Sequence, residues 1–193
     1  MNEALDTMTV RRAIYGRCSV REYSPEIIDQ PTLHSLLAAA VRAPTAMHGE
    51  PWQFVVIQDP AKLKRLSDRA KVTIAAESSR LHPDHKAPGL FSQPGFNVFY
   101  GASTLVVICA ATTGRFEQAD CWLAAENLML AAHAMGLGTC VIGSAAAALN
   151  TPDMKIELGI PPDVTAIAPI IVGKPRGETT PSARKDPQVL AWR

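Results

Sequence analysis

The sequence predicts one folded domain, spanning residues 1–193, in which helices and strands are mixed. The first observation is length, because 193 residues suffice for one domain with a full hydrophobic core and are too few for two ordinary ones. The second is composition, with 47% hydrophobic and 19% charged residues, as is typical of folded proteins. The third is that segments with a helical period alternate with short apolar runs rich in β-branched residues.

The charge balance and the cysteine usage exclude several classes of protein. A net charge of +1 and a pI near 7.7 argue against a broad basic face for duplex nucleic acid or an anionic membrane. The apolar segment 119–135 contains Asp120, Glu126 and His133, which makes it a poor bilayer span. The cysteines form no C-x-x-C pair, and the first residues lack a signal-peptide pattern. We therefore expect a cytoplasmic protein with free thiols and neither a nucleic-acid nor a membrane partner.

The first part of the chain contains a predicted helix, a strand and a second helix. From Leu33, apolar residues recur at i, i+3, i+4, i+7 and i+8, so residues 31–43 are predicted to form a helix that Pro44 ends. Residues 54–57 are an apolar, β-branched run that predicts a strand. The Asp-Pro pair at 59–60 then matches an N-cap followed by proline at the first helical position.

Residues 78–99 contain clustered turn formers and no sustained period, so they are predicted to form a long surface excursion. His82 and His85 lie in this segment with a proline between them. A proline argues against the helical spacing of a metal site, and we interpret both histidines as solvated loop residues. No metal is therefore assigned.

A long apolar helix dominates the second part of the chain. Residues 119–135 are apolar around most of the helix circumference, so this helix is expected to be buried, either centrally or against a second subunit. The other elements follow from apolar runs and turn residues: a strand over 105–111, a strand over 139–142, a short helix over 152–158 ended by Gly159, a strand over 164–172 and an extended tail from residue 173.

Common catalytic motifs do not account for the sequence. Gly136-Leu137-Gly138 opens like a dinucleotide-binding loop, but the required third glycine would fall at Val141. There is no G-x-S-x-G elbow, and the cysteines and histidines have no spacing that selects a thiol nucleophile. We assign no catalytic side chain.

A basic segment near the N-terminus has the pattern expected for a phosphate site. In an extended backbone, Arg17, Ser19 and Arg21 would lie on one face. Two guanidinium groups and a hydroxyl suit a phosphate with adjoining hydroxyls, because arginine binds phosphate through bidentate, charge-assisted hydrogen bonds. The alternative is a solvated basic strand edge.

Four motifs, in this order, resemble the FMN-dependent nitroreductase family. They are R-x-S-x-R-x-[FY] at 17–23, P-[ST]-x5-P-W-x-F at 44–54, G-L-G-T-x-x-I-G at 136–143, and V-G-x-P at 172–175 followed by a basic tail. The resemblance covers most of the chain, from Arg11 to Trp192. It implies an α+β fold with a central, mainly antiparallel sheet flanked by helices, an intertwined homodimer, and FMN bound at the subunit interface.

The resemblance also implies site residues by position. Arg17, Cys18 and Ser19 match residues that hold the FMN phosphate and ribityl chain. Arg21 matches a basic position near the pyrimidine edge, where a cation would stabilise the negative charge that reduction places on N1 and O2. Further matches are the tail residues that close on the phosphate, Arg184 and Lys185, and the segment whose backbone faces the N5 and O4 edge, Ile142, Gly143 and Ser144.

The loop APTAMHGEPWQF at 43–54 would, by the same resemblance, contact FMN held mainly by the other subunit. Its contacting residues would be Thr45, Ala46, Met47, His48 and Glu50. The family more often has asparagine and glutamine at the last two positions. A glutamate donates a hydrogen bond only when protonated, so Glu50 is expected to accept from flavin N3–H or a ribityl hydroxyl, and His48 to donate.

The implied activity is that of an FMN-dependent NAD(P)H oxidoreductase. NADH or NADPH would deliver hydride to N5 and then be replaced by an acceptor such as a nitroaromatic or a quinone, in a ping-pong cycle. Phe91, Phe96 and Tyr100 are interpreted as part of the acceptor pocket, with cover of the core as the alternative. Three other hypotheses stay open: a specialised reduced-flavin reaction such as dehalogenation or flavin fragmentation, a non-catalytic flavin-binding protein, and a flavin-free interaction dimer.

Overall fold

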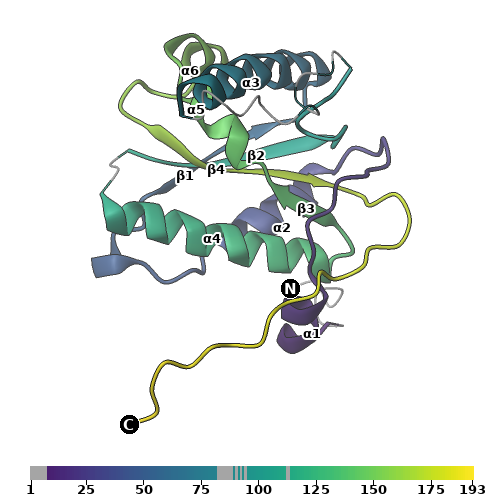
Figure 1. Cartoon of the computed structure of the whole chain (residues 1–193), viewed down its shortest axis with the longest axis vertical. Coiled ribbons are helices and arrows are strands. Elements are labelled where there is room, and N and C mark those ends of the chain that lie inside the picture. The colour runs from purple at the N-terminus through teal and green to yellow at the C-terminus, as the bar shows by residue number, and fades with distance from the viewer. Residues whose placement is uncertain (1–7, 82–88, 90, 92, 94, 112–113) are drawn as a thin grey trace.

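A four-stranded antiparallel sheet with helices on both faces forms the centre of the molecule (Figure 1). The computed structural model describes residues 8–81, 89, 91, 93, 95–111 and 114–193. The strands are β1 (Trp52–Ile57), β2 (Thr104–Ala110), β3 (Gly138–Val141) and β4 (Thr165–Gly173). Their order in the sheet is β1-β2-β4-β3, and every neighbouring pair is antiparallel. This arrangement confirms the predicted α+β fold with an antiparallel sheet.

The apolar run at residues 105–110 of β2 explains why both faces of the sheet are covered. Every residue of this strand is buried. Because alternate side chains of a strand point to opposite faces, Leu105 and Val107 join one hydrophobic cluster while Val106 and Ile108 join the other. An apolar residue at every position, rather than every second one, is what a strand buried on both faces requires.

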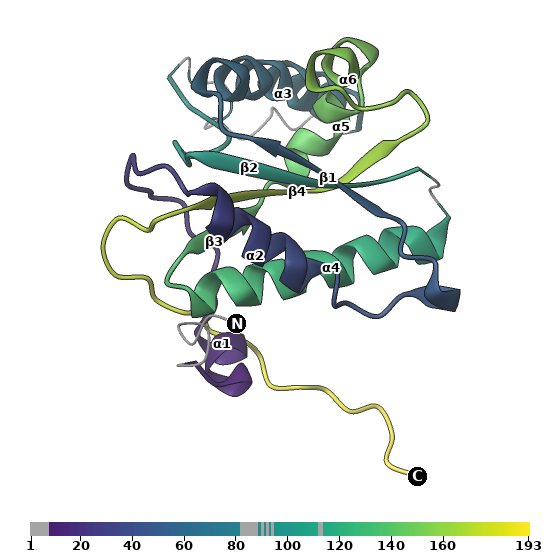
Figure 2. The same cartoon turned by 180° about the vertical axis from the view of Figure 1, so that it is seen from behind.

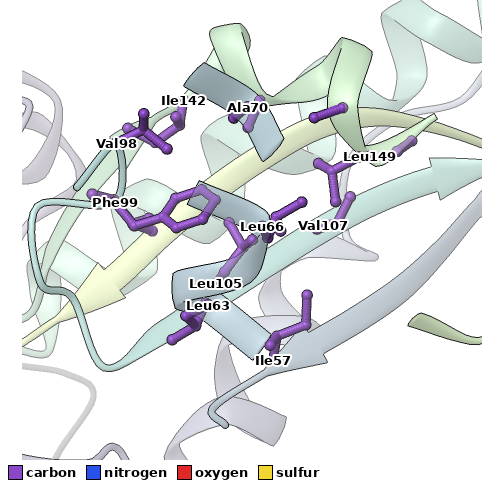
Figure 3. Packing of buried hydrophobic residues seen from close by; sticks show 14 of the residues in the cluster. Ile57, Leu63, Leu66, Ala70, Val98, Phe99, Leu105, Val107, Ile142 and Leu149 are labelled. Atoms are coloured by element: carbon purple, nitrogen blue, oxygen red, sulfur yellow. The ribbon is translucent and has the colours of Figure 1, made fainter. Parts of the chain in front are cut away.

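Three helices cover one face: α3 (Pro60–Leu81), α5 (Ala146–Leu149) and α6 (Pro152–Leu158). The start of α3 is the predicted one, since the Asp59 carboxylate accepts the Ala61 N–H at 2.8 Å. Leu63 and Leu66 of α3 pack with Phe99 and Leu105 in the core beneath it (Figure 3). The predicted glycine stop of α6 is also confirmed, because Gly159 has a left-handed φ of 70°.

The other face is covered by α2 (Gln30–Ala40) and α4 (Arg115–Ala134), as the two opposite views show (Figures 1 and 2). The Asp29 carboxylate caps α2 by accepting the Thr32 N–H at 2.8 Å. Leu36 and Ala40 of α2 are fully buried in the same cluster as Leu128 of α4. Among the helices that the structure describes, none is long and apolar enough to cross a bilayer.

Several predicted boundaries differ from the structure. The helix predicted over 31–43 ends at Ala40, and residues 41–43 form turns. The predicted start of the excursion at residue 78 is too early, because α3 continues to Leu81. The first strong helix-breaking residue, a proline, comes after Leu81 in the sequence. His82 and His85 lie outside the described residues. A short helix that the sequence did not predict, α1 (Val10–Gly16), precedes the basic segment.

The segment after α1 runs extended along β3. Ser19 pairs with Thr139, and the Val20 N–H donates to the Thr139 carbonyl at 2.9 Å. Gly138 permits this approach, since a Cβ at that position would lie 2.8 Å from the Val20 side chain. At the other terminus, residues 176–193 have no regular structure and run past α1 and away from the sheet, as predicted for an extended tail (Figures 1 and 2).

Candidate functional site

A cavity of about 180 Å³ lies where the end of α1 meets the C-terminal end of α4. Its lining includes Arg17 and Cys18, both predicted site residues, together with His133 and Thr139. The Arg17 side chain is 18% exposed, and its Nε lies 3.6 Å from Glu126 Oε1. The guanidinium is therefore positioned by a neighbouring helix rather than free in solvent. Ser19, the third predicted phosphate residue, is exposed beside this cavity's lining strand.

His133 gives the cavity a second basic group. Its Nε2 would lie 2.7 Å from a Cβ at Gly16, so the glycine lets the end of α1 pack onto the imidazole. Partial burial, and then the nearby guanidinium groups of Arg17 and Arg12, lower the pKa of His133. His133 is therefore mostly uncharged at neutral pH, and the positive charge in this cavity that favours an anion comes from Arg17.

Arg21 lines a different recess, of about 260 Å³, at the start of β2. Its guanidinium carbon lies 5.8 Å from the centre of the Tyr100 ring, a cation–π arrangement. Tyr100 has a left-handed φ of 53°. Arg176 lines the same recess, and its backbone N–H donates to the Glu22 carbonyl at 3.0 Å. Within the chain, the two arginines of the basic motif thus line separate hollows.

The three aromatic residues predicted for the acceptor pocket form a continuous row. Phe91 and Phe96, and then Phe96 and Tyr100, make edge-to-face contacts with ring centroids 5.5 Å apart. All three pack against the core cluster beneath α3. They therefore cover the core, which is the alternative role that the sequence analysis left open. Their contact with an acceptor stays a prediction.

The flavin-edge segment predicted at Ile142 lies close to this row. Ile142 is buried in the same cluster as Val98 (Figure 3). Gly143 and Ser144 are exposed in a short 3₁₀ turn, η3 (Gly143–Ala145). Exposed backbone beside a buried anchor is compatible with contact to a ligand edge, and that contact also stays a prediction.

The loop between α2 and β1 has an unusual backbone. It contains a short 3₁₀ turn, η2 (Ala46–His48), and φ is positive at Met47 (53°), His48 (54°) and Glu50 (39°). Each such conformation costs a non-glycine residue on the order of 1 kcal/mol or more, and such residues concentrate at binding sites. The Met47 side chain is 98% exposed, while Thr45 and Ala46 are half-buried.

A buried carboxylate holds this loop. Asp120 of α4 is 5% exposed, and both of its oxygens accept the Ala46 N–H at 3.2 Å. Asp120 and the loop also line a hollow of about 260 Å³ with Phe116 of α4. The strained loop is therefore anchored to the N-terminal end of α4.

Of the predicted residues, 17–18 and 45–50 lie at opposite ends of α4 and do not meet within one chain. Asp120, beside residues 45–50, and His133, beside residues 17–18, are separated by about 20 Å along the helix at ~1.5 Å per residue. Figures 1 and 2 show the same separation, with the loop at one end of α4 and α1 at the other. Arg184 and Lys185 are exposed on the tail and join neither group.

Comparison with known proteins identifies the family. Residues 14–174 match the nitroreductase family over most of the chain. This chain belongs to the nitroreductase family. It is 27% identical over 172 residues to an Archaeoglobus fulgidus protein provisionally named NADH dehydrogenase/NAD(P)H nitroreductase, and the match covers 86% of each chain. These findings confirm the predicted family and its oxidoreductase type.

Solved structures of other nitroreductases share the fold. A nitroreductase with bound FMN from Bacteroides fragilis superposes with a TM-score of 0.83 at 24% identity, covering 97% of this chain and 100% of that chain. A nitroreductase with bound FMN from Desulfitobacterium hafniense gives 0.78 at 20% identity, covering 96% and 95%. The predicted nitroreductase-like fold is confirmed.

The structure adds three candidate site residues to this nitroreductase-family chain that the sequence analysis did not assign to the site: Asp120, His133 and Arg176. A signal for the first two exists in the sequence, because they are polar residues in an otherwise apolar helix. Burial raises the pKa of Cys109 to about 12 and that of Cys121 to about 11, which makes these two thiols poor nucleophiles.

Proposed function

We propose that this chain is an FMN-dependent oxidoreductase that takes electrons from NADH or NADPH and passes them to a nitroaromatic, a quinone or a similar acceptor. Membership of the nitroreductase family supports this proposal, as do the name of the Archaeoglobus relative and the FMN bound in the two structural neighbours. The observation on this chain that carries it is the cavity lined by Arg17, Cys18 and His133. Its basic side chains fit a phosphate dianion at the positions where the sequence motif expects one.

In this proposal the chain's residues bind and orient the cofactor, which supplies the hydride chemistry when bound. Arg17 and His133 hold the phosphate, Ser19 holds ribityl hydroxyls, and Arg21 lies at the pyrimidine edge. Arg184 and Lys185 of the tail close on the phosphate. Because no side chain has to act as a nucleophile, the absence of a catalytic triad motif from the sequence is no obstacle.

The proposal includes a homodimer, since the two groups of site residues lie at opposite ends of α4 within one chain. A second copy would bring its residues 45–50 to the cavity of the first. Large apolar side chains left exposed along α4 support this arrangement: Phe116 is 60% exposed, Trp122 43% and Leu123 46%. The nearly fully exposed Met47 lies beside Phe116, at the N-terminal end of α4.

The donor and the acceptor would use the same flavin face in turn, giving a ping-pong cycle. The row Phe91, Phe96 and Tyr100 would form part of the acceptor pocket. In the loop of the second copy, His48 would donate a hydrogen bond to the flavin and Glu50 would accept one from N3–H or a ribityl hydroxyl. The exposed, left-handed backbone at both residues supports a contact made outside their own protomer.

The visible spectrum of the purified protein tests the function directly. We expect bound FMN, bleaching of its absorbance when NADH or NADPH is added without oxygen, and its return when a nitroaromatic or quinone follows. A protein that binds FMN but is not bleached by either donor would be a flavin-binding protein without turnover. A finding that the protein takes up no FMN would exclude both the oxidoreductase and the flavin-binding protein without turnover.

Arg17→Ala tests the phosphate assignment. Losing a charge-assisted contact should cost about 1.5–3 kcal/mol, which is roughly a ten- to hundredfold rise in the Kd of FMN. Turnover at saturating FMN should change far less. The matched control is Arg65→Ala, which removes a guanidinium paired with Glu157 at 2.6 Å on the opposite face of the sheet. An equal Kd for the two variants would contradict the assignment.

A further inference from the structure

The recess beside Arg21 is lined by two arginines from distant parts of the chain. Arg21 belongs to the N-terminal basic segment, and Arg176 follows β4. Two backbone contacts fix these segments together: Tyr23 pairs with Pro175, and the Arg176 N–H donates to the Glu22 carbonyl at 3.0 Å. The Arg176 side chain is therefore attached at a defined point on the rim of the recess.

Neither arginine is paired with a carboxylate of the described residues. Within the described part of the chain, Arg21 and Arg176 form no ion pair, and Glu22, although it lines the recess, pairs with neither. Lys174 provides the contrast, because only two residues earlier its Nζ lies 2.9 Å from Glu26 Oε2. Arg21 instead lies over the Tyr100 ring. With two arginines and one glutamate in its lining, the recess has a net positive charge, which favours an anion.

We propose that Arg176 is a second cation at the pyrimidine edge of the flavin and that it acts with Arg21 to stabilise the reduced, anionic cofactor. This inference rests on the proposed function, which puts FMN in the site and Arg21 at that edge. Hydride transfer adds two electrons and one proton to the neutral oxidised flavin while NAD(P)H is oxidised to NAD(P)⁺. The reduced ring then carries a negative charge at N1 and O2, and a nearby cation lowers its free energy.

Both cations should affect the binding of oxidised FMN and of reduced FMN differently. The oxidised ring is neutral, so it gains little from either guanidinium. The anionic reduced ring gains from both. Removing Arg176 is therefore expected to weaken the binding of reduced FMN far more than that of oxidised FMN, which lowers the midpoint potential of the bound flavin.

The test is a redox titration at saturating FMN of the unmodified protein, Arg176→Gln, Arg176→Lys and Arg21→Ala, with Lys174→Gln as the matched control. Arg176→Gln and Arg21→Ala should each lower the midpoint potential. A tenfold selective loss of reduced-flavin binding corresponds to a fall of about 30 mV for a two-electron couple. Arg176→Lys should restore most of the potential because it keeps the charge, and Lys174→Gln should leave it unchanged. The Kd of oxidised FMN should be nearly the same in every variant.

Three results would overturn the inference. One is a potential in Arg176→Gln equal to that of the unmodified protein while Arg21→Ala lowers it. Another is an equal loss of oxidised and reduced FMN binding, which would assign Arg176 to the phosphate. The last is an unchanged potential with a raised KM for NADPH but not NADH, which would assign the recess to a phosphate of the donor. Failure of the proposed function is distinguishable, since the unmodified protein would then bind no flavin or would bind a flavin that neither NADH nor NADPH reduces.

Discussion

His133 links the chemistry of the candidate site to the stability of the fold. Its pKa lies below the ordinary value of 6.5 because of partial burial and the neighbouring arginines. As the pH falls through 6.5, the unfolded chain binds a proton that the folded protein does not bind, so the free energy of unfolding decreases toward acid pH. His133 therefore makes the flavin-free fold less stable below that pH.

His133→Gln tests this effect. We expect the free energy of unfolding, from urea titrations between about pH 5 and pH 8, to depend less on pH in the variant than in the unmodified protein. Hydrogen bonds lower the pKa of the capping residues Asp29 and Asp59, which titrate in a more acidic window and leave this comparison clear. Parallel curves for the two proteins would show that the histidine environment does not differ between the folded and unfolded chains.

At the scale of elements, the strained loop depends on α4 through a single buried carboxylate. Asp120→Ala removes the acceptor of the Ala46 N–H, an interaction with a charged group of the kind that contributes about 1.5–3 kcal/mol. We expect hydrogen exchange at the Ala46 amide to become roughly ten- to hundredfold faster. Asp153→Ala is the control, because its exposed carboxylate pairs with Arg69 on the opposite face of the sheet. Unaltered exchange at Ala46 would mean that other contacts hold the loop.

The elements that could be predicted are those whose signals are local. The cap Asp59 and the glycine at 159 mark helix ends by their own hydrogen bonding or backbone conformation, and both are confirmed. α1 was missed because it is short and buries only Ala13, so it shows no apolar period. It is fixed instead by packing onto α4.

The site was predictable only in part for the same reason. The basic motif and the loop are contiguous in sequence, so their residue types suggested a phosphate and a binding loop. The approach of His133 to Arg17, of Asp120 to Ala46 and of Arg176 to Arg21 depends on tertiary packing. No spacing along the chain encodes these contacts.

At the scale of the whole molecule, the exposed apolar side of α4 predicts self-association. Leu123→Glu adds a charge to this side, and we expect it to shift sedimentation toward the monomer and to weaken FMN binding in parallel. Ile156→Glu is the control, since Ile156 is 82% exposed on α6, across the sheet. A Leu123→Glu monomer that binds FMN as tightly as the unmodified protein would exclude a site shared between copies.

The placement of the two groups of site residues at opposite ends of α4 has a genetic consequence. We expect Asp120→Ala, by releasing the loop at residues 45–50, to weaken FMN binding as Arg17→Ala does. If each site takes one group from each copy, the two variant chains should then complement each other when coexpressed. A mixed dimer would contain one site with both defects and one with neither. Random pairing makes about half of the dimers mixed, so on the order of a quarter of all sites would regain normal FMN affinity. Defects confined within one chain would give no such recovery.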